Sequence, residues 1–423
     1  MTVVSGSDTA GVPASVDVAI LGGGMVGASL AVALAPLRLS IAVIEAREPG
    51  KPGQPSYDDR STAVSLGSQR ILDTMGVWDS LTDTATAIRR IHVSDRGRFG
   101  ATRLDSREEG VPALGYVIEN RVLGRALWKR LQSTANVHVV CPATLTGVRQ
   151  GGSSVQIDCA VGDEAATLGA RLAVAADGAQ SRARELAGIG VSSRSYEQSA
   201  VITNVTTQER HDGTAFERFT DEGPLAFLPM SNGRCSVVWT MASERVDGIM
   251  GLSDADFLAA LQQCFGYRLG RLLKCGERHA YPLSLMKADE IVDERLALVG
   301  NAAHGLHPVA GQGFNLGLRD VAALADVVAD VVADSDEGAG DTLGGETMLR
   351  QYAHWRRDDQ SNVVTMTDGL VRTFTNPFPP VRAARGLALV ALDALPPARR
   401  LFARRAMGLE GRLPRLARGV SLG

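Results

Sequence analysis

Residues 16–27, Val-Asp-Val-Ala-Ile-Leu-Gly-Gly-Gly-Met-Val-Gly, decide the fold of this chain of 423 residues. Residues 16–21 are apolar apart from Asp17, which predicts a buried strand that runs directly into a glycine turn. An apolar helix is expected over residues 25–34 and a second apolar strand over residues 39–44. This order forms a βαβ unit, which requires a parallel sheet with a right-handed crossover. The sequence therefore predicts an α/β fold.

The glycines of the turn have the spacing of a dinucleotide-binding loop. Gly22, Gly24 and Gly27 fit the pattern G-x-G-x-x-G. The first glycine permits the tight turn, the second lets a pyrophosphate approach the backbone, and the third lets the helix pack close to the sheet. The free N–H groups of the helix start, at Met25 and Val26, carry a partial positive charge for the phosphates. The alternative is a glycine turn in an α/β domain that binds no nucleotide.

A carboxylate stands at the end of the second strand. Glu45 directly follows residues 39–44. A carboxylate at this position accepts both hydrogen bonds of an adenosine ribose, and its charge disfavours a 2′-phosphate. The full context of strand, glycine turn, helix and Glu45 therefore favours a bound dinucleotide over an empty turn.

A second glycine-rich segment, residues 299–315, lies in the second half of the chain. Gly311, Gln312 and Gly313 precede an apolar helix that is expected over residues 317–334. The N-terminus of this helix would stabilise negative charge on a nearby flavin pyrimidine. Pro308 and Gly311 would let the backbone meet the plane of the ring. A plain helix-entry loop is the alternative, but the two segments together predict one FAD bound from both ends of the chain.

Three further residues are candidates for cofactor contacts. Asp177 closes an apolar strand expected over residues 171–176, so its carboxylate would lie near the ribityl chain or the pyrophosphate. Its alternative is an ordinary Asp-Gly turn at a strand end. Arg60 and Arg121 are candidate phosphate clamps, and surface salt bridges are the alternative for both.

The sequence predicts no metal site. His304 and His307 are three residues apart, but no third histidine or carboxylate stands nearby at the spacing of a metal ligand. Structural or substrate-side roles are therefore expected for the two histidines. The acidic pairs at residues 58–59 and 358–359 are interpreted as solvated faces rather than acid/base dyads.

The bulk composition is that of a globular enzyme, with 45% hydrophobic and 22% charged residues. A formal net charge of −3 gives no sign of nucleic-acid binding. The five cysteines form no CxxC pair, and residues 1–15 lack the basic and apolar regions of a signal peptide. No stretch reaches the roughly 18 apolar residues of a membrane span. A cytoplasmic location is expected.

Charge is concentrated at the end of the chain. Residues 381–423 contain nine Arg, no Lys, one Asp and one Glu, a net charge of +7, so the rest of the chain carries −10. Leucines, valine and phenylalanine are interleaved with these arginines. Such a segment suits an anionic membrane face or an acidic partner subunit. The alternative is a helical tail that covers the body and keeps its arginines in solvent.

Taken together, these residues resemble the class A flavoprotein monooxygenases, the fold group of para-hydroxybenzoate hydroxylase. The resemblance covers nearly the whole chain, and its three fingerprints are residues 22–27, residues 176–181 and residues 300–308. Within that group the chain is similar to the ubiquinone-biosynthesis hydroxylases, through residues 59–65, 92–97, 306–320, 405–408 and 413–419. One departure is Asn301, because the wider group usually has Asp there. An amide keeps a hydrogen bond to the ribityl chain but loses the charge.

The resemblance implies a Rossmann-like FAD-binding domain with a mostly antiparallel β-sheet substrate domain and a C-terminal helical segment. The implied FAD domain comprises residues 14–85, 118–190 and 293–360, the substrate domain residues 86–117 and 191–292, and the basic helical segment residues 361–423. The residues implied to line the FAD are Gly22, Gly24, Met25, Val26, Gly27, Glu45, Arg60, Arg121, Asp177, Asn301, Pro308, Gly311, Gly313, Phe314 and Asn315. The residues implied to act at the reacting ring are His307, Pro308, Gly311 and Gln312.

The implied reaction is the hydroxylation of a prenylated phenol of the 2-polyprenyl-6-methoxyphenol type. NAD(P)H visits transiently to reduce the flavin, and O₂ then forms a C4a-hydroperoxide whose distal oxygen adds to the ring. His307 or Tyr281 could accept the phenol proton. Two rival interpretations stay open: a flavin-dependent reductase of prenyl double bonds, and a flavin-holding scaffold subunit of a quinone-biosynthesis complex. The basic tail would meet the membrane surface or such a complex.

Overall fold

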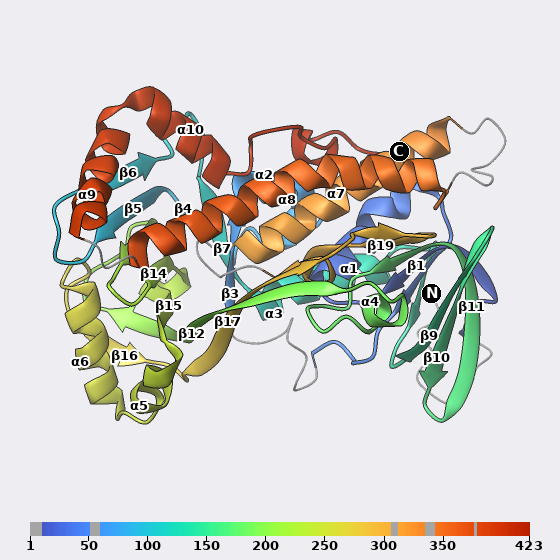
Figure 1. The fold of residues 1–423 in the computed structure, drawn as a ribbon, viewed down its shortest axis with the longest axis horizontal. Helices are drawn as coiled ribbons and strands as arrows, with labels where there is room; N and C mark the ends of the chain where they lie inside the picture. Colours follow the sequence, from blue (N-terminus) through green and yellow to red (C-terminus); the bar gives the residue numbers. More distant parts are fainter. Residues whose placement is uncertain (1–10, 51–59, 306–311, 335–342, 376–378) are drawn as a thin grey trace.

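The βαβ unit predicted at the start of the chain is confirmed. A computed structural model describes residues 11–50, 60–305, 312–334, 343–375 and 379–423 (Figure 1). Strand β1 (Ser15–Leu21) leads through the glycine turn into helix α1 (Met25–Leu34), and β2 (Ile41–Ile44) returns parallel to β1. All four side chains of β2 are buried, as a strand covered on both faces requires.

The βαβ unit forms the centre of an eight-stranded sheet in the order β18-β19-β11-β1-β2-β8, with β10 and β9 attached to β11. The added strands are β8 (Val137–Val140), β9 (Thr144–Gly151), β10 (Ser154–Val161), β11 (Glu164–Ala175), β18 (Val292–Asp293) and β19 (Leu296–Leu298). The strand expected over residues 171–176 is thus longer at its start. Residues 164–170 continue it because they pair with β10 as an antiparallel hairpin, while the later residues pair in parallel with β1.

Long helices cover this sheet. They are α1, α3 (Asn120–Gln132), α7 (Gln312–Ala333) and α8 (Glu346–Thr375), with the shorter α2 (Leu66–Thr74) and α4 (Arg182–Leu186) nearby (Figure 1). The expected start of α7 at residue 317 was wrong. A Cβ on Gly317 would lie 3.1 Å from the Cα of Gly300, so this glycine allows a close contact inside the helix and does not mark its start.

Most of the other strands form a nine-stranded, mainly antiparallel sheet in the order β20-β17-β12-β15-β14-β13-β5-β6, with β16 attached to β12. They are β5 (Arg90–Asp95), β6 (Ala101–Asp105), β12 (Val191–Thr207), β13 (Thr214–Phe219), β14 (Pro224–Pro229), β15 (Arg234–Ala242), β16 (Leu272–Cys275), β17 (His279–Ala288) and β20 (His304–Gly305). One face packs against α5 (Val246–Met250) and α6 (Asp254–Phe265), around buried Phe227 and Phe257.

A three-stranded sheet joins the two large sheets. It contains β3 (Ser61–Ser65), β4 (Thr86–Ile88) and β7 (Gly115–Glu119) in the order β3-β7-β4. Ile88 and Val117 of this sheet form a buried cluster with Ala215 and Met230 of the nine-stranded sheet region. The face of the nine-stranded sheet that points away from α6 therefore looks toward β3 and β7.

The C-terminal segment lies against the body of the protein. Helices α9 (Pro379–Ala394) and α10 (Pro396–Ala406) lie beside the β5–β6 hairpin (Figure 1). The hydroxyl of Thr102 donates to the Leu389 carbonyl at 2.7 Å, and the Arg385 guanidinium lies 3.5 Å from the Asp95 carboxylate. Arg415 likewise pairs with Asp326 at 2.9 Å. Several arginines of the basic tail thus neutralise acids of the body, as expected for a tail that covers it.

Candidate active site

The glycine turn is too tightly packed for any side chain. Gly22 has a φ of +106°, and a Cβ there would lie 2.7 Å from backbone atoms of Ala176 and Asp177. A Cβ on Gly27 would lie 1.9 Å from the carbonyl oxygen of Gly22. These contacts press the start of α1 onto the ends of β1 and β11. The roles predicted for the first and third glycines therefore have a direct steric basis.

Two side chains hold the middle of the turn. Glu45 accepts hydrogen bonds from the Gly23 N–H at 2.6 Å and the Arg47 N–H at 2.9 Å. Burial raises the pKa of this carboxyl, and the backbone N–H groups partly oppose that rise. On the other side the Trp128 indole N–H donates to the Gly23 carbonyl at 2.9 Å. Trp128 was not predicted from the sequence, because its only signal is that a buried indole N–H needs an acceptor.

The first and third fingerprints, residues 22–27 and 300–308, meet at Val26. The N-cap of α1 is Gly24, so no side chain caps the first N–H groups of the helix. The next residues, Met25 and Val26, are partly buried against the main core. Gly300 has a φ of +59°, and a Cβ on it would lie 3.1 Å from the Val26 methyl groups. Two segments that are far apart in sequence therefore form one site at the ends of the parallel strands.

Asp177 is the clearest sign that a ligand belongs here. One carboxylate oxygen accepts from the Ala183 N–H at 2.9 Å. The other, Oδ1, is buried and has no hydrogen-bond partner among the described residues. Such an oxygen is costly unless a ligand or water donates to it. The adjacent Gly178 has a φ of +90° and open space where a side chain would lie. A hydroxyl-rich chain such as ribityl fits this position.

The start of α7 has open space beside Gly313 and is attached to β3 through Asn315. A Cβ on Gly313 would meet nothing within 4 Å. Asn315 accepts from the Ser65 N–H at 2.8 Å and donates to the Ala63 carbonyl at 2.8 Å, so its amide ties α7 to β3. Phe314 is partly buried against the core, and Asn301 is exposed. His307, Pro308 and Gly311 lie outside the described residues, and the side chain of Gln312 does as well.

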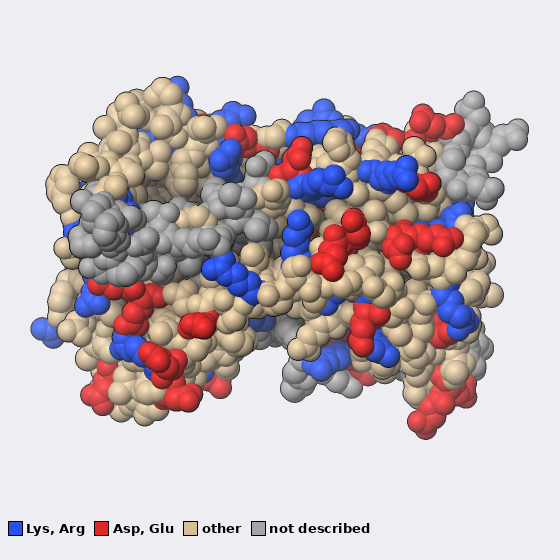
Figure 2. Space-filling model, in the orientation of Figure 1, with Lys and Arg blue, Asp and Glu red and all other residues tan. Residues whose placement is uncertain are grey.

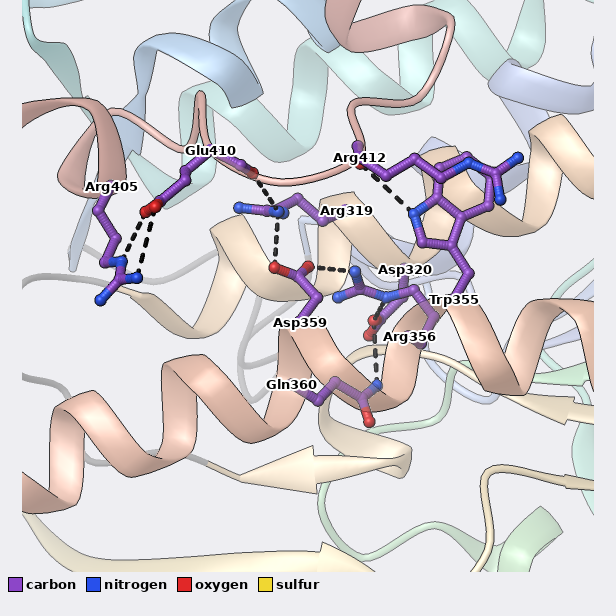
Figure 3. Close-up of polar contacts among 9 residues, drawn as sticks. All are labelled: Arg319, Asp320, Trp355, Arg356, Asp359, Gln360, Arg405, Glu410 and Arg412. Atoms are coloured by element: carbon purple, nitrogen blue, oxygen red, sulfur yellow. Dashed lines mark hydrogen bonds and ion pairs between the residues drawn. The ribbon is translucent and has the colours of Figure 1, made fainter. Parts of the chain in front are cut away.

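A buried charge network is centred on Asp320, and Figure 3 shows its contacts with Arg356 and Gln360. Asp320 has no exposed side-chain surface and accepts from the Gly300 N–H at 2.9 Å and from His304 at 2.6 Å. It also accepts from Arg356 at 2.6 Å and Gln360 at 3.2 Å. Burial alone would raise the pKa of Asp320, but the Arg356 and His304 charges hold it well below its usual range. The backbone at Gly300 is therefore positioned by a carboxylate that stays ionised.

The network extends to residues that the sequence analysis placed in solvent. Asp359 pairs with Arg356 and, at 2.6 Å, with Arg319 (Figure 3). Its side chain is only 18% exposed, so the interpretation of Asp359 as part of a solvated face was wrong. His304 binds Asp320 and so has a structural role, one of the two roles expected for it. Among the described residues, no group of three His, Cys, Asp or Glu side chains is placed to hold a metal ion.

Arg60 and Arg121 come together at the joint between the sheets. Both line a cavity of about 470 Å³ that also contains Glu119, Arg234 and His279. Arg121 donates to Glu119 at 2.8 Å. The Arg60 guanidinium lies over the ring of Tyr281, 4.7 Å from its centroid. Arg60 and Arg121, the two predicted phosphate clamps, are thus neighbours. Arg60 contacts Tyr281, and Arg121 contacts Glu119.

The described residues fit a bound FAD. The helix start of α1 presents uncapped N–H groups for a pyrophosphate, and Asp177 has an unused buried oxygen. The backbone has open space at Gly178 and Gly313, where a ligand could approach closely. These features converge where the first, second and third fingerprints meet.

Comparisons with known proteins agree with this site. The family model for the FAD binding domain matches residues 15–366. Ubiquinone hydroxylase UbiL of Rhodospirillum rubrum is 42% identical over 96% of this chain and 93% of that protein. The 3-demethoxyubiquinol 3-hydroxylase of Escherichia coli is 33% identical over 93% of this chain and 98% of that protein. Both alignments span almost the full length of the two proteins.

Solved structures support the fold. The p-nitrophenol 4-monooxygenase PnpA of Pseudomonas putida superposes with a TM-score of 0.77 at 18% identity, over 95% of this chain and 100% of that one. The α/β fold expected from the sequence, with its antiparallel second sheet, is thereby confirmed, as are the FAD cofactor and the assignment to the oxidoreductases. This chain belongs to the FAD-dependent aromatic monooxygenases, in the branch that contains the ubiquinone hydroxylases.

Proposed function

We propose that this chain hydroxylates a prenylated phenol of the 2-polyprenyl-6-methoxyphenol type in ubiquinone biosynthesis, with NAD(P)H and O₂ as co-substrates. The observation that carries this proposal is the full-length relation to ubiquinone hydroxylase UbiL and 3-demethoxyubiquinol 3-hydroxylase. The names of both relatives describe hydroxylation on the ubiquinone pathway.

We propose the following positions for the cofactor. The pyrophosphate would be held by the glycine turn and the start of α1, that is by Gly22, Gly24, Met25, Val26 and Gly27. The adenosine ribose would bind Glu45, and the ribityl chain would bind Asp177 and Asn301. The isoalloxazine would lie against the segment at the start of α7 that contains Gly311, Gly313, Phe314 and Asn315. Because both ends of the Asn315 amide are used on β3, its contact with the ring would come from its backbone. Arg60 and Arg121 would contact the cofactor from the cavity that they line.

Bound FAD supplies the redox chemistry, in which it passes electrons from NAD(P)H to O₂ and one oxygen atom to the ring. The protein has three tasks: to hold the cofactor, to exclude water and to orient the phenol. The start of α7 serves the first task, because helix N–H groups stabilise negative charge at the pyrimidine edge. Pro308 and Gln312, with His307, are proposed to complete the surface around the reacting carbon.

The first test is the source of the oxygen in the product. Purified holoenzyme in detergent, given NADH or NADPH and 2-methoxy-6-prenylphenol under ¹⁸O₂, is expected to yield a phenol that carries one labelled oxygen. Mass spectrometry of the organic product is the measurement, and a reaction without the phenol is the control. A saturated prenyl chain without labelled oxygen would instead identify a prenyl reductase. Substrate-independent nicotinamide oxidation that yields only hydrogen peroxide would contradict the proposed hydroxylation.

The substrate's prenyl chain lies in the bilayer, and one surface of the protein is suited to meet it. Four large apolar side chains are exposed in the β5–β6 hairpin, on α9 and α10 and between these two helices: Phe99, Leu387, Leu395 and Leu401, at 81, 67, 55 and 52%. Figure 2 shows few charged atoms over α9 and α10. No helix among the described residues is long and apolar enough to cross a bilayer. We propose that this surface rests on the cytoplasmic membrane face, with exposed Arg400 and Arg404 toward anionic lipid.

Charged substitutions on this surface test the membrane proposal. The double variant Leu387→Glu/Leu401→Glu is expected to weaken binding to phosphatidylglycerol vesicles about a hundredfold or more in a co-sedimentation assay, since two buried leucines contribute roughly 3 kcal/mol or more. Leu273→Glu is the matched control, because Leu273 is 57% exposed on another strand, β16. Equal vesicle binding by the double variant and the control would exclude this surface.

A further inference from the structure

Glu217 lies in the middle of β13, between two other strands of the nine-stranded sheet. It stands opposite Val93 of β5 and Ala226 of β14. Side chains alternate along a strand. Phe216 points toward α6, where its ring meets that of Phe265 at 5.5 Å. Glu217 therefore points to the opposite face, together with its neighbours Ala215 and Phe219.

That face is the one turned toward the candidate active site. Ala215 belongs to a buried cluster with Val117 of β7, and Ala63 of β3 packs against the same cluster. The Ala63 carbonyl in turn accepts the hydrogen bond from Asn315 at the start of α7. Next to Glu217 on the other side, Phe219 packs against Leu389 of α9. Glu217 thus lies between two parts of the structure. On one side are β3 and β7, and Asn315 ties α7 to β3; on the other side is α9, which packs against Phe219.

Glu217 and its cross-strand neighbours are more accessible than most of the residues on either side of them on this face. Glu217 keeps some accessible surface, whereas its neighbours on the same face, Ala215 and Phe219, are 5% and 2% exposed. Across the sheet Val93, Ala226 and Val238 also keep some accessible surface. On β15 the residues that flank Val238 on this face, Ser236 and Thr240, are again buried, at 1% and 0% exposed. These four residues, Glu217, Val93, Ala226 and Val238, form a row across the sheet that is more accessible than its buried flanks, and apart from Glu217 the row is apolar.

Among the residues that the structure describes, the Glu217 carboxylate has no hydrogen-bond or ion-pair partner. On the same face of the sheet, Asp95 of β5 stands opposite Phe219, and its carboxylate lies 3.5 Å from Arg385 of α9. Burial raises the pKa of Glu217 to about 7. An isolated buried carboxylate is costly, and active sites are where proteins keep such groups.

We propose that Glu217 is a catalytic residue that accepts the hydrogen bond of the substrate's phenol hydroxyl; this proposal rests on the proposed function. As the ring is attacked, the phenol O–H bond breaks and the proton forms a new O–H bond on the Glu217 carboxylate. The electron pair stays on the phenol oxygen and raises the electron density of the ring carbons. Because the hydroxyl is held at the one carboxylate of an otherwise apolar row, Glu217 also decides which ring carbon is presented for hydroxylation.

The test compares two ligands in two proteins. FAD-loaded wild type and Glu217→Gln are titrated at pH 8 with 2-methoxy-6-prenylphenol and with its O-methyl ether, which cannot donate. Binding is followed by the change in flavin absorbance. Wild type is expected to bind the phenol about tenfold more tightly than the ether, since a hydrogen bond to a charged group carries this preference. In Glu217→Gln this preference for the phenol over the ether is expected to fall to about twofold or less.

Controls separate the possible outcomes. Glu209→Gln, an exposed acid near β12 of the same sheet, is expected to keep the wild-type ratio. Glu217→Gln is expected to fold, because an amide in place of a buried carboxylate removes a charge from the interior; retained flavin and an unchanged or higher Tm at pH 8 check this. An unchanged ratio in Glu217→Gln, in an enzyme that still yields labelled product, overturns the assignment of Glu217 alone. A wild type that neither binds nor hydroxylates the phenol overturns the proposed function as well.

Discussion

Gly27→Ala is expected to leave a protein that no longer retains FAD. The added methyl group would lie 1.9 Å from the carbonyl oxygen of Gly22 and 3.3 Å from the Cβ of Ala176. Both neighbours are held in the sheet, because Gly22 and Ala176 each bond through their backbone N–H to an adjacent strand. The clash therefore cannot be relieved by a side-chain rotation, and α1 must move away from β1.

The expected loss of FAD follows from this movement. The N–H groups at the start of α1 bind the pyrophosphate only where the glycine turn presents them. Overpacking of this kind costs about 3 kcal/mol, which corresponds to roughly a hundredfold weaker FAD binding. The ratio of flavin to protein after gel filtration, and titration of apoprotein with FAD, measure the effect. Gly248→Ala is the control, since a Cβ at Gly248 in α5 meets nothing within 4 Å. Normal flavin content in Gly27→Ala would contradict the proposed position of the pyrophosphate.

Asp320→Asn is expected to lower the free energy of unfolding by about 3–5 kcal/mol at pH 7, the usual cost of removing one partner of a buried ion pair. Arg356 and His304, each 2% exposed, would lose the carboxylate that compensates their burial. The Gly300 N–H would lose its charged acceptor as well, so the backbone next to the proposed ribityl site would move. Weaker FAD binding is therefore expected together with lower stability.

The effect has a definite pH dependence. The pKa of Asp320 is lowered in the folded state, so its stabilising contribution is complete above the pKa of the unfolded chain, about 4. The contribution is lost only as the pH falls toward the lower folded value. Urea unfolding should therefore show the full difference between wild type and Asp320→Asn at pH 7 and a smaller one at pH 3. Asp358→Asn, an exposed acid on α8, is the control and should change stability by less than about 0.5 kcal/mol. A loss below about 1 kcal/mol in Asp320→Asn would show that the network contributes little.

Much of the cofactor site could be predicted from the sequence, because its signals are local. Hydrophobic runs placed β1, α1 and β2, and the spacing of Gly22, Gly24 and Gly27 has one steric explanation that the structure bears out. The glycine at position 317 shows the limit of such reasoning. It was interpreted as the beginning of a helix, although it is needed for a contact with Gly300 inside α7. A spacing pattern identifies a glycine but not the atom that approaches it.

The sequence by itself determined the α/β class, the dinucleotide turn and the family of this protein, since strand, turn and helix preferences act between residues that are close in the chain. Only the tertiary structure decided which polar groups share the interior. Asp320 and Arg356 are 36 residues apart, Trp128 reaches a glycine 105 residues away, and Glu217 owes its position to the strands on either side of it. Burial creates these relations by removing water from groups that the folded chain brings together, and no local pattern records which groups those will be.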